Sequence, residues 1–86
     1  MRWRRNPRVL WRTAPGYLAV ATVGGHTLEV GGPGGELWLH LAEWITEEEL
    51  IAALARRYGA DEPSVSPDVR SLLEELSGQG YVDRDG

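Results

Sequence analysis

The sequence predicts an α+β domain in which a three-stranded antiparallel sheet comes first and three helices follow. Two observations carry this prediction. Residues 8–30 contain short runs of strand-forming side chains that are separated by tight-turn signals. From residue 36 onward, apolar side chains recur every three or four positions, as they do in amphipathic helices. The length of 86 residues fits one small domain with a limited hydrophobic core.

The three strands are expected to form a meander. Pro15 and Gly16 are a turn pair, and Gly24 and Gly25 supply the positive φ angles that a two-residue hairpin turn requires. Turns of this kind join neighbouring antiparallel strands. The sequence therefore predicts strands at residues 8–14, 17–23 and 26–30, with the third strand at an edge of the sheet.

A glycine-rich segment, Gly-Gly-Pro-Gly-Gly at residues 31–35, follows the third strand. Its spacing does not fit a G-x-G-x-x-G phosphate loop, and the chain contains no lysine. We therefore expect a flexible connector between sheet and helices rather than a nucleotide site, and no cofactor.

The first two helices are predicted on either side of Thr46. Residues 36–44 carry apolar side chains at helical spacing. Thr46 and Glu49 form a capping box, in which each side chain accepts a hydrogen bond from the other residue's amide, and Gly59 ends the second helix. The apolar stripe of this second helix consists of Leu50, Ile51, Leu54 and Tyr58.

The third helix is predicted over residues 67–78, after a loop at residues 60–65. Ser66 is placed to cap it, and Pro67 suits its first turn because proline has no amide to satisfy there. Residues 81–82 should form a short extended tail.

Charge is distributed unevenly along the chain. Residues 1–28 carry five arginines and no acid, whereas residues 29–86 carry all 13 acids against four arginines. We expect residues 1–7 to be a basic, solvated arm and residues 8–86 to be a single recognition domain. Contact of the arm with an anionic partner is the alternative.

The four tryptophans divide into two pairs. Trp38 and Trp44 are expected to pack with the helices. Trp3 and Trp11 lie in or beside the arginine-rich segment. Cation–π contacts with the chain's own arginines are favoured there over stacking on single-stranded nucleic acid.

Several classes of site are disfavoured by what the chain lacks. Without cysteine it has no disulfide, thiolate zinc site or cysteine nucleophile, and without lysine it has no Schiff-base chemistry. His26 and His40 are far apart in sequence, so no metal site is expected. No G-x-S-x-G motif is present, and a domain of this size should have little room for a deep pocket. We therefore expect a protein that is not an enzyme.

No segment of the sequence predicts membrane insertion or secretion. The apolar runs are shorter than the roughly 20 residues that span a bilayer. The start, Met-Arg-Trp-Arg-Arg, also lacks the apolar segment of a secretory signal. A cytoplasmic location is expected.

The order of strands and helices resembles a winged helix-turn-helix with its sheet moved to the front, and residues 17–85 resemble the PqqD-type proteins. The resemblance rests on the hairpin at 18–30, on Trp38 in an I-W-x-L position, on residues 46–50 as T-x-E-E-L, and on residues 68–82 as D-V-x-x-F-L-x-x-L-x-x-x-G-L-V. Among these proteins, the short chain is most similar to the stand-alone B1 proteins of split lasso-peptide systems. It departs from the family at residues 30–35, Val-Gly-Gly-Pro-Gly-Gly, where an L-N-x-T/S-x-x segment is usual between the third strand and the first helix.

The resemblance implies a RiPP recognition element, which binds the leader segment of a ribosomally made precursor peptide. The expected partners are that leader peptide and a separate leader peptidase, with a cyclase as a further candidate. An exposed edge of the third strand would accept the leader as an added strand, and the third helix would supply side-chain pockets. The expected binding residues are His26, Thr27, Leu28, Glu29, Val30, Asp68, Val69, Leu72, Leu73 and Leu76. Of the helix residues, Val69, Leu72 and Leu76 are expected to touch the ligand and Leu73 to be mainly core.

Two other classes of function remain open at this point. A winged-helix DNA-binding protein would place its third helix in the major groove, but Asp68, Glu74 and Glu75 of that helix would oppose phosphate. A purely structural subunit of a larger enzyme complex is the second alternative.

Overall fold

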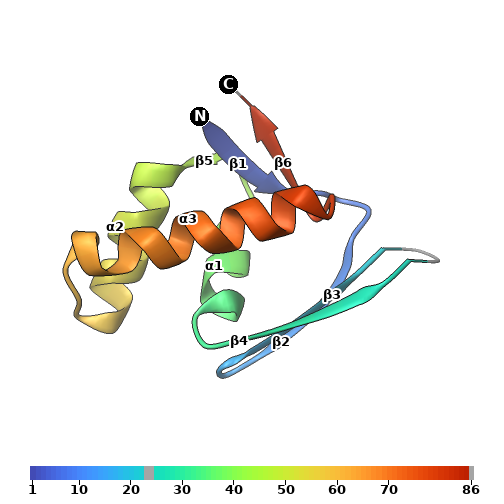
Figure 1. Ribbon diagram of the computed structural model, residues 1–86, viewed down its shortest axis with the longest axis horizontal. Coiled ribbons are helices and arrows are strands. Elements are labelled where there is room, and N and C mark those ends of the chain that lie inside the picture. The colour runs from blue at the N-terminus through green and yellow to red at the C-terminus, as the bar shows by residue number, and fades with distance from the viewer. Residues whose placement is uncertain (23–24, 86) are drawn as a thin grey trace.

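The computed structural model describes residues 1–22 and 25–85. Over these residues the chain forms six strands and three helices, and the α+β class with helices after a meander is confirmed (Figure 1). The elements, in chain order, are β1 (Arg2–Arg5), β2 (Leu10–Ala14), β3 (Tyr17–Ala21), β4 (Thr27–Gly31), α1 (Gly34–His40), β5 (Ile45–Thr46), α2 (Glu47–Tyr58), α3 (Glu62–Gly78) and β6 (Val82–Asp85).

The predicted meander is present, with β3 between β2 and β4. Trp11 pairs with Val20, and Val20 pairs with Leu28, so the three strands share one continuous register. The predicted end of the second strand at Val23 and the predicted turn residue Gly24 lie outside the described residues.

A second sheet, which we call the terminal sheet, has β1 at its centre between β5 and β6. The expectation that residues 1–7 form a solvated arm is therefore wrong for residues 2–5. Trp3 explains the difference, because its side chain is only 2% exposed and belongs to the hydrophobic core. Pairing with β6 also brings the two ends of the chain together (Figure 1).

The arginines on the other face of β1 form salt bridges with acidic side chains and a cation–π contact with an aromatic ring. In the register of the sheet, Arg2 lies opposite Asp85 and Arg4 opposite Asp83, and both pairs form salt bridges. The Arg4 guanidinium also lies 4.6 Å from the centre of the Trp44 ring. The cation–π contacts expected for Trp3 and Trp11 are confirmed as well, because the Arg84 guanidinium lies 5.8 Å from the centre of the Trp3 ring and the Arg5 guanidinium lies 4.7 Å from that of Trp11.

All three helices of the described chain lie on one side of the meander (Figure 1). The inward-facing residues of β3, Leu18 and Val20, are buried against this layer. Trp38 of α1 is fully buried in the same cluster, as the sequence predicts. The other buried apolar residues of the core include Val9, Leu37, Leu41, Leu50, Ile51, Leu54, Val69, Leu73, Leu76, Tyr81 and Val82.

Helix α1 begins earlier and ends earlier than predicted. Its first residues, Gly34 and Gly35, are buried rather than part of a flexible connector. A Cβ atom on Gly34 would lie 2.5 Å from Val30 Cγ1, and one on Gly35 would lie 2.9 Å from the Tyr17 carbonyl oxygen. The helix start therefore packs directly on the meander, and only glycine fits this close approach.

The predicted start and end of α2 are confirmed. The Thr46 hydroxyl accepts from the Glu49 amide at 3.1 Å, and the Glu49 carboxylate accepts from the Thr46 amide at 3.2 Å. Gly59 ends the helix in the left-handed conformation, with a φ of 63°. Thr46 is also the last residue of β5, so the capping box joins the terminal sheet to α2.

Helix α3 begins at Glu62, which makes most of the expected loop at 60–65 helical. The predicted cap at Ser66 is wrong, and Pro67 lies inside the helix. Pro63 lies in the first turn of α3 instead, where a residue without an amide hydrogen is tolerated. The additional turn brings Val65 against the core.

No helix within residues 1–22 and 25–85 is long and apolar enough to cross a membrane.

Candidate functional site: a sheet edge that leads into an apolar groove

Strand β4 is an edge of the meander, as predicted. It pairs with β3 on one side, and across residues 1–22 and 25–85 no strand pairs with its other side. Leu28 and Val30 are half-buried against the core, whereas Thr27 and Glu29 are exposed. Such an edge presents backbone amides and carbonyls that lack a strand partner.

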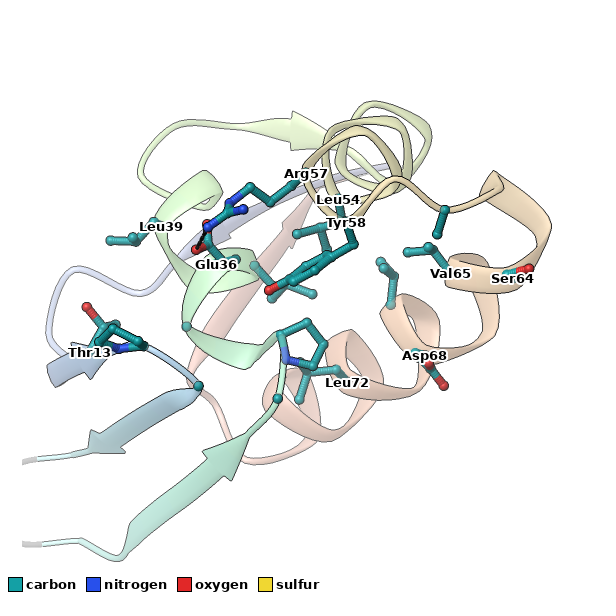
Figure 2. Close-up of a pocket in the computed structure, with 18 of the residues that line it drawn as sticks. Thr13, Glu36, Leu39, Leu54, Arg57, Tyr58, Ser64, Val65, Asp68 and Leu72 are labelled. Carbon is teal, nitrogen blue, oxygen red and sulfur yellow. Dashed lines mark ion pairs between the residues drawn. The ribbon is translucent and has the colours of Figure 1, made fainter.

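A groove of about 910 Å³ opens beside the far end of this strand. Its walls are α1, the last turns of α2, the first half of α3 and the turn between β2 and β3 (Figure 2). The expectation that the domain lacks room for a pocket is therefore wrong.

Apolar side chains make up most of the groove. Leu37, Leu54 and Val69 are buried side chains that line it. Leu39 and Tyr58, at its rim, are each 49% exposed. A surface with this composition suits a ligand with bulky apolar side chains.

Charged groups lie on two sides of the groove. Glu36 of α1 and Arg57 of α2 form an ion pair with an N···O distance of 3.5 Å, and this pair bridges the two helices (Figure 2). Asp68 is on the α3 side and is exposed. The groove therefore has an apolar interior and a charged rim.

The groove and the edge of β4 are continuous. Gly32 and Pro33, which follow β4 directly, are among the residues that line the groove. A chain lying along the outer edge of β4 toward Gly31 would reach the groove with its next residues.

The opposite end of β4 is held to the last part of the chain. The Tyr81 hydroxyl donates to the His26 carbonyl oxygen at 2.9 Å. Tyr81 follows α3 and is buried, so this bond ties the start of β4 to the end of α3.

The structure separates the predicted helix residues into two groups. Asp68, Val69 and Leu72 line the groove, and Leu72 is half-buried. Leu73 and Leu76 are both 0% exposed. Leu76 was expected to touch the ligand together with Val69 and Leu72. It is buried in the core beside Leu73 instead.

The part of the site that comes from α1 and α2 was not predicted from the sequence. Tyr58 was assigned to the buried stripe of α2, yet it lies at the groove rim because it occupies the last helical position. One feature of the sequence could have indicated Leu39 as a site residue. It is a large apolar residue that lies outside the apolar stripe formed by Leu37 and Leu41.

Within the described residues, no cluster of three or more histidine or acidic side chains is arranged to hold a metal ion.

The fold and the groove define a small α+β domain with an open sheet edge beside a helical groove. Residues 16–82, most of the chain, match the family model described as coenzyme PQQ synthesis protein D (PqqD). The chain therefore belongs to the PqqD family. A search of curated proteins gives no match.

A solved structure with the same fold is described as TbiB1 in complex with the TbiA(beta) leader peptide. The two chains are 20% identical, with a TM-score of 0.80. The similarity covers 96% of this chain and 98% of TbiB1. The similarity therefore extends beyond the segment matched by the family model, which begins after β1 and ends at the first residue of β6.

Proposed function

We propose that this protein binds the leader segment of a ribosomally made precursor peptide and presents it to a separate maturation enzyme. The observation that carries the proposal is the open edge of β4, which leads directly into the apolar groove. Family membership and the fold shared with TbiB1, which was solved with a leader peptide, support it.

Strand addition to β4 would supply sequence-independent affinity. An extended peptide can pair its backbone with the outward-facing amides and carbonyls of residues 26–30. Exposed Thr27 and Glu29 would contribute little through their side chains, because the pairing uses main-chain groups.

The groove would supply selectivity through side-chain contacts. Bulky apolar residues of the leader would contact Leu39, Tyr58 and Leu72, which retain exposed surface. Val69 contributes to the wall although it is nearly buried. Leu73 and Leu76 would support the groove from the core and would not touch the peptide.

The protein would act as a binding subunit and not as a catalyst. A leader held on β4 would be delivered to a leader peptidase, with a cyclase as a further candidate, in the cytoplasm. Purified protein incubated with a precursor peptide should leave it intact in a mass spectrum; cleavage by the protein alone would contradict this part of the proposal.

DNA binding through α3 is less consistent with the structure. Glu74 and Glu75 are on the exposed surface of this helix and would be repelled by phosphate. Arg2 and Arg4, which could have offset this charge, already pair with Asp85 and Asp83.

Leader binding can be tested by fluorescence polarisation with a panel of labelled lasso-peptide leaders, the TbiA(beta) leader among them. We expect at least one leader to bind without added metal or nucleotide. In the Leu72→Glu variant, a charge enters the apolar groove, so affinity should fall at least about tenfold, which corresponds to about 1.4 kcal/mol.

Ser71→Glu is the matched control, because it adds the same charge to an exposed position one residue away on α3. This variant should bind within about twofold of the wild type. Leu39→Glu tests the same groove from α1, where the half-exposed side chain can be replaced with little effect on folding. Unchanged binding in both groove variants would exclude the groove as the leader site.

A further inference from the structure

The meander has a second edge, which is β2. This strand pairs only with β3 in the described parts of the chain, and it lies at the opposite side of the sheet from β4. Four of its five residues are exposed, including Leu10 at 62% and Trp11 at 43%. The leader site proposed above does not use this edge.

Trp11 is held in a defined position although it is exposed. Its ring lies 6.4 Å from that of Trp38 in an edge-on arrangement. The Arg5 guanidinium lies 4.7 Å from the centre of the Trp11 ring. These contacts on neighbouring elements fix an aromatic surface at the sheet edge, and such preorganised aromatic residues are typical of contact sites.

Two arginines near this edge have no acidic partner. In the described chain, no carboxylate lies within salt-bridge distance of Arg8 or Arg12, in contrast to Arg2 and Arg4. Arg8 follows a fixed turn, because its amide donates to the Asn6 side-chain oxygen at 2.9 Å. The β2 edge therefore carries uncompensated positive charge on a protein whose net charge is −4.

Protection against aggregation explains only part of this surface. Charged residues on an edge strand often prevent unwanted pairing, and Arg12 could serve in this way. Leu10 and Trp11 have the opposite effect, because exposed apolar residues on an edge promote pairing.

We propose that the β2 edge, defined by Arg8, Leu10, Trp11 and Arg12, is a second docking site that accepts an extended, acidic segment of a partner protein. The segment would pair its backbone with β2, place acidic side chains near Arg8 and Arg12, and contact Trp11 with an apolar one. Nucleic acid is a poorer match, because residues 29–86 contain all 13 acids of the chain and would repel a longer polyanion.

This site goes beyond leader binding and does not depend on it. Because β2 and β4 are opposite edges of one meander, a partner on β2 would leave β4 open. A leader peptide and a partner protein could then be bound at the same time, at the two edges of one sheet.

The site can be tested with three labelled probes added to the isotopically labelled full chain. They are an alternating valine–glutamate octapeptide, the corresponding valine–lysine octapeptide and an eight-thymidine oligonucleotide. We expect the acidic peptide to bind, to shift backbone amide signals of residues 8–14, and to bind more weakly at higher salt. The lysine peptide should bind at least tenfold more weakly.

Charge reversal locates the site. Arg12→Glu should weaken binding of the acidic peptide at least fivefold, whereas Arg56→Glu, an equal change at an exposed position on α2, should leave it within twofold. Trp11→Ala should also weaken binding. Equal binding of the acidic and basic peptides, tighter binding of the oligonucleotide, signal changes confined to residues 26–31, or no binding at millimolar peptide would each overturn the proposal.

Discussion

The terminal sheet and the meander are both built from three antiparallel strands, yet they leave very different surfaces. In the terminal sheet, the central strand β1 buries Trp3 on one face and pairs its arginines with β6 acids on the other. The meander buries one face under the helices, and within residues 1–22 and 25–85 no strand pairs with the outer side of β2 or β4. Among the described residues each sheet has two edge strands, but those of the meander are five residues long, whereas β5 has two residues and β6 has four. The meander therefore offers the longer edges for pairing with other chains.

The largest expected effect comes from removing the central side chain of the terminal sheet. Trp3→Ala should lower the free energy of unfolding by about 3–5 kcal/mol, because it leaves a cavity in the core. Trp11→Ala, in the meander, should lower it by less than half as much, since that ring is already 43% exposed. Urea denaturation of both variants would measure the difference. Equal losses would mean that the two sheets contribute to stability in the same way.

A smaller effect is expected where the meander contacts α1. Gly35→Ala should cost about 1–3 kcal/mol, because the new methyl group would be placed 2.9 Å from the Tyr17 carbonyl oxygen. Gly78→Ala is the control variant, and we expect it to raise the stability of the protein. No atom lies within 4 Å of its added Cβ, and alanine favours a helix over glycine by about 0.5–1 kcal/mol. Thermal unfolding should therefore shift down for the first variant and up for the second.

Proline on β4 tests whether the edge of the meander receives a strand. Glu29→Pro removes an amide, and we expect it to weaken leader binding at least about tenfold, or about 1.4 kcal/mol. Glu29→Ala retains that amide and should change binding less than threefold. Fluorescence polarisation gives both affinities, and circular dichroism checks that the fold is intact. A folded proline variant with full affinity would rule out strand addition at this position.

The smallest effect is expected at the junction between the terminal sheet and α2. Thr46→Ala removes the side-chain cap and should cost about 0.5–2 kcal/mol of stability. Leader affinity should not change, because Thr46 is not among the residues that line the groove. An unmoved denaturation midpoint would show that the capping box contributes nothing to the helix.

Features with local signals were predictable from the sequence. Turn residues and alternating side chains indicated the meander, and Thr46 with Glu49 indicated the start of α2. The β4 edge followed from the order of the strands. In each of these cases, the residues that determine the structure are close together in the chain.

Features that depend on distant partners were not predictable in the same way. The sequence Arg-Trp-Arg-Arg of β1 carries little strand signal, and its partners are at residues 45–46 and 82–85. The start of α3 offered two proline signals, at Pro63 and Pro67, and the packing of Val65 favours the earlier one. The groove combines side chains of all three described helices, so no single segment indicated it.

The position of β1 also has a consequence for the order of events during synthesis. β1 is made before the other described elements, but its pairing with β6 joins Arg2 to Asp85, 83 positions later. Contacts between such distant residues form slowly, because a long loop must close first. The terminal sheet therefore cannot be completed until residues 82–85 have left the ribosome, although β1, β5 and the meander are made before them.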